Sequence, residues 1–161
     1  MPPRQPRARV YVPATTAMLV ELVQSGSMPT RGIGHAVTPQ VRAAGPDGDD
    51  DEWEFEAFGD AAAACVALLN GVSGGLRRVV VSVDLDPADV APADGPPPSV
   101  VAVPDEVSRR SVAAVHVDDE HAAAVVARVL DGAPTGLLDD VALDWFDASE
   151  IEALVDQLSR T

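Results

Sequence analysis

The feature that most constrains the fold is an alternation of strand-like and helix-like segments along the whole chain. The segments RRVVVSVDL (77–85) and SVAAVHV (111–117) are rich in β-branched residues and predict strands. Between such segments apolar residues recur at helical spacing, as in the stretch from Phe55 to Leu69. Proline and glycine mark the turns between them. These signals predict the order β-α-β-α-α-β-(β)-β-α-β-α.

This order predicts an α/β fold, with one mixed or mostly parallel sheet of roughly 4–6 strands covered by roughly 4–5 helices. A chain of 161 residues is long enough to bury its core as one domain. We expect that single domain to span residues 9–159, with a flexible N-terminal segment at 1–8 and exposed loops at 46–52 and 86–98. Aromatic residues make up only 4% of the chain, so the core must consist mainly of Ala, Val and Leu.

Charge and cysteine content indicate which partners and which cellular compartment to expect. The net charge is −15. Phosphate backbones and anionic membranes attract basic surfaces, so we expect no direct binding to nucleic acid or to a membrane. A basic protein partner, or solubility alone, explains the charge better. Cys65 is the only cysteine, and the N-terminus lacks the apolar stretch of a signal peptide, so we predict a cytoplasmic protein.

The stretch VHVDDEH (115–121) holds two of the three histidines and is the main candidate site. In a strand over 111–117, His116 and Asp118 point to the same face, and His121 follows on the first turn of the next helix. These three side chains could bind a metal ion or act as acid and base, with His35 as the remaining histidine.

A structural interpretation of VHVDDEH explains more of its residues. Asp118 or Asp119 would cap the helix by accepting hydrogen bonds from its free backbone N–H groups. Glu120 would add negative charge at the positive end of the helix dipole. We favour capping, because turns from a strand into a helix usually have this composition.

Other site templates fail, so we predict no metal and no cofactor. The acidic loop 46–52 has Glu52 where a calcium loop requires glycine. The match to G-x-S-x-G around Ser73 follows a helix, whereas a nucleophile elbow follows a strand.

Two arginine pairs, Arg77–Arg78 and Arg109–Arg110, each precede a predicted strand. If these strands are neighbours, four guanidinium groups could form an anion or nucleotide site. The simpler interpretation is that charges at strand entrances deter edge pairing.

Four short motifs carry a resemblance to a known family. They are VYVPAT near the start, HAVTP-x-x-R at 35–42, AVHVDD at 114–119 and DWF near the end. With them the sequence resembles a family of small uncharacterised actinobacterial proteins, a domain of unknown function. The resemblance covers most of the chain and implies an actinobacterial, cytoplasmic, single-domain protein. It implies no activity, cofactor or catalytic residue.

These motifs lie where strands end and turn into helices. Ligand sites of open α/β sheets gather at the carboxyl ends of the strands. If the strands at 9–13, 33–38 and 111–117 are parallel neighbours, polar side chains converge at one edge. The predicted set is Thr15, Thr16, His35, Thr38, His116, Asp118 and Asp119.

The sequence favours a non-enzymatic protein-interaction module that binds a protein partner or forms a homo-oligomer, because it lacks a complete catalytic constellation. The alternative is a small enzyme or ligand-binding domain with a site at the strand ends, formed by His35, His116, Asp118 and His121. A third interpretation is an anion or nucleotide sensor that uses both arginine pairs. An exposed apolar patch would favour the first, and a pocket holding several of the polar candidates would favour the second.

Overall fold

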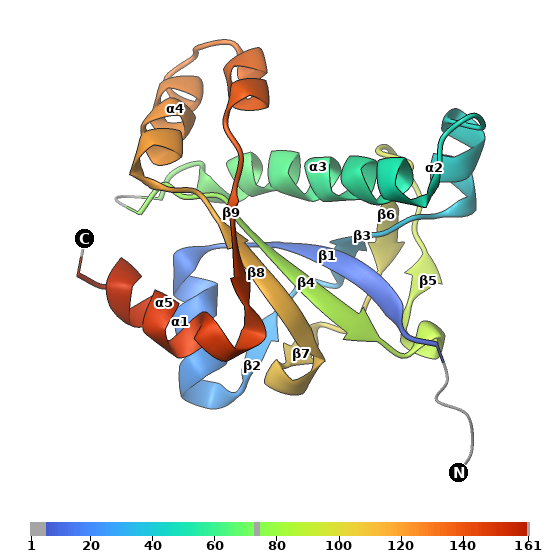
Figure 1. Cartoon of the computed structure of the whole chain (residues 1–161), viewed down its shortest axis with the longest axis horizontal. Helices are drawn as coiled ribbons and strands as arrows, with labels where there is room; N and C mark the ends of the chain where they lie inside the picture. Colours follow the sequence, from blue (N-terminus) through green and yellow to red (C-terminus); the bar gives the residue numbers. More distant parts are fainter. Residues whose placement is uncertain (1–5, 73–74, 161) are drawn as a thin grey trace.

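The computed structural model describes residues 6–72 and 75–160, and its centre is a seven-stranded sheet in the order β5-β6-β3-β1-β4-β8-β9 (Figure 1). Ser73 and residues 1–5 of the predicted N-terminal segment lie outside the described residues. The strands of this sheet are β1 (Ala8–Ala14), β3 (Ile33–His35), β4 (Val79–Leu85), β5 (Ala91–Pro92), β6 (Val100–Ala102), β8 (Val112–Val117) and β9 (Asp144–Asp147). A second sheet pairs β2 (Ser27–Pro29) with β7 (Glu106–Ser108).

The predicted mixed or mostly parallel sheet of 4–6 strands is wrong, because every pair of neighbouring strands is antiparallel. The error has a physical source in β4, whose residues are almost all buried on both of its faces. A strand buried on both faces is a continuous apolar run, which is also the pattern of a strand in a parallel sheet. Strand direction is set by the connections, and β2 and β7 lie within connections that the sequence pattern left unassigned.

Among the described residues, every α-helix except the last begins at a side-chain cap. Thr15 and Thr38 accept hydrogen bonds from the backbone N–H groups of Met18 and Val41. The helices are α1 (Thr16–Ser25), α2 (Pro39–Ala44), α3 (Asp50–Leu69), α4 (Glu120–Leu130) and α5 (Ile151–Leu158), with short 3-10 turns η1 (Pro87–Asp89), η2 (Arg109–Ser111), η3 (Thr135–Asp140) and η4 (Ala148–Glu150). Asp147 and Glu150 form a capping box at η4.

One face of the sheet is covered by α1, α5 and the small β2–β7 sheet (Figure 1). Alternate residues of β1 and β4 point to this side, because successive side chains of a strand face opposite ways. They pack against Leu19 and Leu22 of α1 and against Ile151 and Leu154 of α5. This larger part of the core is aliphatic, as the composition predicts.

The other face of the sheet is covered by α3, which crosses β1, β3 and β4 (Figure 1). The helix turns small residues toward the sheet, namely Ala57, Ala61, Ala62 and Cys65. Side chains this small allow the helix to lie close to the strands. Strands β8 and β9 lie at one end of the strand order, and α4 and η3 form a lobe next to them (Figure 1).

The two predicted loops contain regular structure. Residues 50–52 of the acidic loop form the first turn of α3, which Asp49 caps. The segment 86–98 is mostly exposed and includes η1 and the edge strand β5. Among the described residues, none of the helices has both the length and the apolar composition needed to cross a bilayer.

Candidate functional site

The strand directions place the polar residues that were predicted to converge at two different edges of the sheet. β1 and β8 both run antiparallel to β4, so they share a direction, whereas β3 runs against β1. The pairings of Val79 with Ala14 and with Val117 place the ends of β1 and β8 at one edge. His35 instead lies opposite Tyr11, and Thr38 follows it toward the other edge. The predicted convergence is therefore wrong, because His35 and Thr38 lie away from the edge that Thr15, Thr16, His116, Asp118 and Asp119 share.

Two aspartates of VHVDDEH have separate structural partners. Asp119 caps α4 by accepting a hydrogen bond of 2.8 Å from the backbone N–H of Ala122. Asp118 is 1% exposed and forms an ion pair with Arg78, whose Nε and Nη2 donate over 2.9 and 2.8 Å. Arg78 also donates from Nη2 to the carbonyl of Val141. Capping is thus confirmed, and Asp118 joins the start of β4 to the end of β8.

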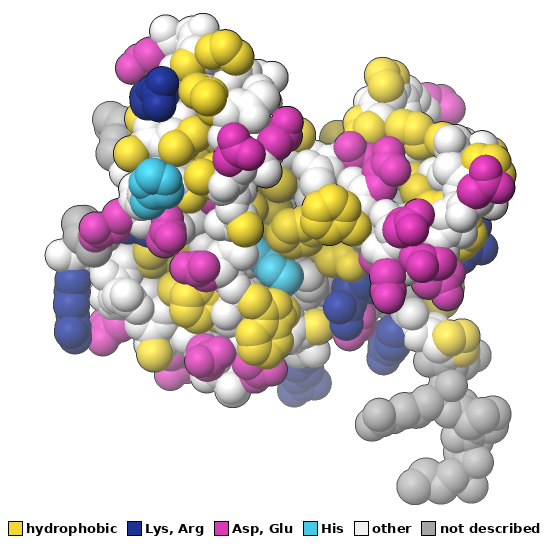
Figure 2. Space-filling model, turned by 45° about the horizontal axis from the view of Figure 1, so that its top comes forward, with side chains coloured by type: hydrophobic (Ala, Val, Ile, Leu, Met, Phe, Trp, Pro, Cys, Tyr) yellow, Lys and Arg dark blue, Asp and Glu magenta, His cyan; other side chains and the backbone are white. Residues whose placement is uncertain are grey.

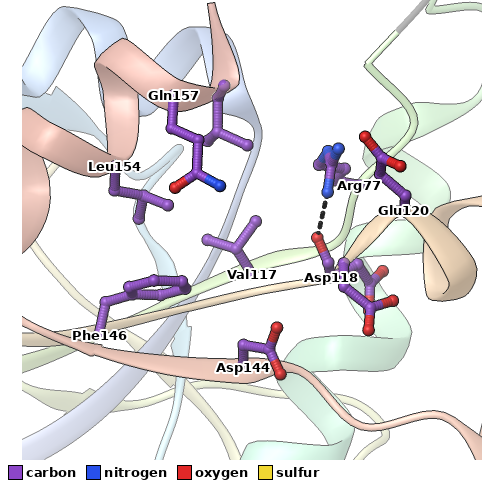
Figure 3. Close-up of a pocket in the computed structure, with 10 residues that line it drawn as sticks. Arg77, Val117, Asp118, Glu120, Asp144, Phe146, Leu154 and Gln157 are labelled. Carbon is purple, nitrogen blue, oxygen red and sulfur yellow. Dashed lines mark hydrogen bonds between the residues drawn. The ribbon is translucent and has the colours of Figure 1, made fainter. Parts of the chain in front are cut away.

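A cleft of about 170 Å³ lies beside this turn (Figure 3). Its apolar wall is formed by Val117, Phe146 and Leu154, and Asp144 and Glu120 lie on its polar side. Arg77 reaches the same cleft, and its Nη1 donates to the backbone carbonyl of Asp118 over 2.7 Å. Carboxylates outnumber this single guanidinium among the lining residues, so the cleft repels anions.

The two arginine pairs lie at opposite ends of β4 and β8. These strands are neighbours, but Val79 pairs with Val117 and Val83 pairs with Val112, so their entrances are far apart. Arg109 forms an ion pair of 3.0 Å with Glu152 of α5, and Arg110 is exposed. The structure therefore does not bring the four guanidinium groups to one point.

His116 is the penultimate residue of β8, on the face of the sheet that α3 partly covers. Its Nε2 lies 3.0 Å from Oγ of Ser82 on β4, and its ring contacts the edge of Phe58 from α3. Burial, together with the positive charge of Arg9, lowers the pKa of His116 to about 4. Ser82 is 1% exposed, which makes it inaccessible as a nucleophile. His121 is exposed on the first turn of α4.

A groove of about 660 Å³ runs along α3, between this helix and the lobe of α4 and η3. We call it the α3 groove; its lining residues are Ala63, Val66, Ala67, Asn70, Arg78, Val129, Leu130, Thr135, Gly136, Leu138 and Asp139. Phe55 lies on the same flank of α3, two turns before Ala63, and is 77% exposed. Trp145 pairs with His116 across β8 and β9 and is 60% exposed. Figure 2 shows hydrophobic side chains on the floor of the hollow between two lobes, with acidic side chains around it.

A second polar group on this side of the sheet was not predicted. Nδ1 of His35 lies 2.9 Å from Oγ of Ser99, and that hydroxyl donates to Asp60 on α3 over 2.7 Å. Ser99 is fully buried and His35 is 3% exposed. Only one signal in the sequence pointed to this group: Asp60 borders the apolar stripe of α3, where a charged residue needs a partner.

No three His, Cys, Asp or Glu side chains within the described ranges cluster in a way that could hold a metal ion. Cys65 is buried, its thiol donates to the carbonyl of Val79, and burial raises the pKa of the thiol to about 11.

The fold and these surfaces define a small α/β domain with a half-covered antiparallel sheet. The chain belongs to a family of unknown function, DUF6912, whose profile matches residues 8–155. This match confirms the resemblance to a domain of unknown function, whereas the actinobacterial origin and the cytoplasmic location stay predictions. No curated protein and no solved structure matches the chain.

Proposed function

We propose that this domain is a protein-interaction module and that its α3 groove binds a basic, amphipathic helix of a partner protein. The observation that carries the proposal is the groove itself, which is mostly apolar. Two exposed aromatic side chains, Phe55 of α3 and Trp145 of β9, lie on the same side of the sheet. Large exposed apolar surfaces on soluble proteins mark interaction sites. Aromatic side chains supply much of the binding energy of such sites.

A helix fits the shape of this groove. The wall of α3 consists of small side chains at Ala63 and Ala67 with Val66 between them. Small residues allow a second helix to approach within the usual packing distance of about 8–10 Å. The opposite wall, from α4 and η3, supplies aliphatic side chains such as Val129 and Leu138.

The charge around the groove favours a basic partner. Asp139 lines it, and Glu56, Asp131 and Asp140 are exposed on the elements that form its walls. Arg78, on the floor, already pairs with Asp118. A second copy of this chain also carries a net charge of −15, so like charges oppose self-association at the same surface.

Two of the candidate residues for an enzyme have structural partners, which supports an interaction role. Asp118 pairs with Arg78, and His116 lies against Ser82 and Phe58. Each of these contacts stabilises the sheet without any ligand.

The test is a selection from a phage-displayed library of random 20-residue peptides, followed by calorimetric measurement of Kd for the enriched peptides. We expect them to be amphipathic and positively charged. The substitution Ala63→Arg should raise their Kd at least tenfold, which corresponds to a loss of about 1.4 kcal/mol of binding free energy. Ala63 is exposed, so the longer side chain can extend into the groove without disturbing the core.

The matched control is Ala153→Arg, the same substitution at an exposed position of α5 on the other face of the sheet. It adds the same charge and should change Kd less than twofold. Peptides that bind both variants equally well, or that are acidic, would contradict the proposal. Sedimentation of the native protein as a dimer, and of the Ala63→Arg variant as a monomer, would identify a second copy as the occupant and overturn the basic partner.

A further inference from the structure

A separate cavity of about 180 Å³ lies on the other flank of α3, between this helix and strands β1 and β3. Its walls are mainly apolar, with Pro13, Met18, Ala64 and Leu68 among them. Arg31 and Ile33 also line it and are exposed, so the cavity opens to solvent on their side. The one buried titratable side chain in its wall is His35, which is 3% exposed.

Hydrogen bonds fix which nitrogen of His35 carries the proton. The hydroxyl of Ser99 donates to the carboxylate of Asp60, so its oxygen can only accept from His35. Nδ1 of His35 is therefore the protonated nitrogen. Nε2 keeps a free lone pair and is a hydrogen-bond acceptor in the neutral ring.

Nε2 of His35 has no hydrogen-bond partner among the described residues. Fully buried side-chain nitrogen and oxygen atoms in the described part of the chain all have partners, so this nitrogen must reach an open surface. The surface that His35 lines is the cavity. A single acceptor is thus held at the wall of an apolar space by the Ser99–Asp60 pair.

The other polar groups of the cavity restrict the ligand further. The hydroxyl of Thr30 already donates to the carbonyl of Pro104 and accepts from the N–H of Gly32. Burial lowers the pKa of His35, although Asp60 opposes this effect, so the ring is neutral at neutral pH and cannot pair with an anion. The group of the ligand that meets His35 is therefore uncharged and donates one hydrogen bond.

We infer that this cavity is a binding site for a compact apolar molecule with one hydroxyl group, of the size of phenol or a small cyclic alcohol. An apolar cavity of about 150 Å³ in another protein accommodates benzene, so a cavity of about 180 Å³ has room for one ring and one hydroxyl. The hydroxyl donates to Nε2 of His35, and the ring contacts Ala64 and Leu68 from α3. This site is independent of the α3 groove.

The experiment is calorimetric titration of the purified protein with phenol, cyclohexanol, benzene and benzoate at pH 7.5. We expect phenol and cyclohexanol to bind, and benzene to bind about fivefold more weakly because it donates no hydrogen bond. Benzoate should bind more weakly still, because its carboxylate would face a lone pair. The ¹⁵N resonance of Nε2 of His35 should shift when phenol is added.

Two variants locate the site. Ala64→Leu fills the cavity from a helical position and leaves His35 in place, so it should abolish phenol binding while the protein stays folded. His35→Phe removes the acceptor and should bring phenol and benzene to the same Kd. The matched control is Ala67→Leu, three residues further along α3. Ala67 lines the α3 groove and not the cavity, so this substitution should leave phenol binding unchanged.

Each adverse result overturns the inference. If phenol does not bind the native protein, the cavity holds water only. If benzene binds as tightly as phenol, His35 does not select the ligand. If benzoate binds tighter than phenol, Arg31 recognises an anion instead. Binding that survives Ala64→Leu takes place elsewhere on the protein.

Discussion

At the residue scale, the neutral state of His116 makes stability depend on pH. Burial lowers its native pKa to about 4, whereas an unfolded chain has a histidine pKa of about 6.5. Between these values the unfolded state binds more protons than the native state. Stability from this group is therefore full above about pH 6.5 and falls as the pH drops toward about 4.

Replacing His116→Gln should flatten this dependence. The measurement is the urea midpoint of unfolding at several pH values from 7 to 4. The slope of this midpoint against pH is compared between the native protein and the variant, because the variant also loses the contact with Ser82 and so differs in absolute stability. His121→Gln, at an exposed position, is the matched histidine control and should keep the native slope. Equal slopes for the native protein and the His116 variant would show that His116 takes up its proton in the folded state.

At the element scale, the ion pair of Arg78 and Asp118 connects three segments. It joins the entrance of β4 to the exit of β8 and, through the carbonyl of Val141, to the chain that enters β9. Both side chains are at most 5% exposed. Asp118→Asn should therefore lower the free energy of unfolding by about 3–5 kcal/mol, because it leaves a buried guanidinium without its counter-charge.

The comparison is with Arg109→Met, which removes the pair with Glu152. That pair has exposed fractions of 34% and 70% and should cost less than about 1 kcal/mol. Urea unfolding measures both losses. The double variant Arg78→Met/Asp118→Leu should recover part of the stability that Asp118→Asn loses. A loss for Asp118→Asn as small as that for Arg109→Met would mean that water screens the Arg78 pair.

The sequence predicts elements well where they are long. The run at 77–85 contains β4 at Val79–Leu85, and 111–117 contains β8 at Val112–Val117. It did not predict β2 and β7, because three residues show little periodicity, although it did place a strand around the equally short β3. It also could not separate the roles of Asp118 and Asp119, since both can cap a helix and only the position of Arg78 decides between them.

At the scale of the whole molecule, strand direction and distant contacts were beyond the sequence pattern. Alternating strands and helices occur in parallel sheets and also in this antiparallel sheet, so the order alone did not fix the direction of β3. The group of His35, Ser99 and Asp60 joins residues 64 and 39 positions apart in the chain. The sequence did identify His35 as a candidate, but its partners depend on how β3, β6 and α3 meet.

The net charge of −15 leads to a prediction about the whole molecule. Like charges on a compact surface repel one another, and salt screens this repulsion over a Debye length of about 10 Å at 0.1 M. The melting temperature should therefore rise by several degrees between about 20 mM and about 0.5 M NaCl. Buried pairs such as Arg78–Asp118 contribute little to this change because they are screened less.

Charge reversal at exposed helix positions tests the cause. Glu21→Lys with Glu56→Lys changes the net charge by two units at each position, from −15 to −11. Both glutamates are exposed, so the core is unaffected. This variant should melt higher at low salt and gain less from added NaCl, whereas Glu21→Asp with Glu56→Asp keeps the charge and should keep the native response. A melting temperature that falls with salt, or equal gains in all three proteins, would mean that surface ion pairs outweigh the repulsion.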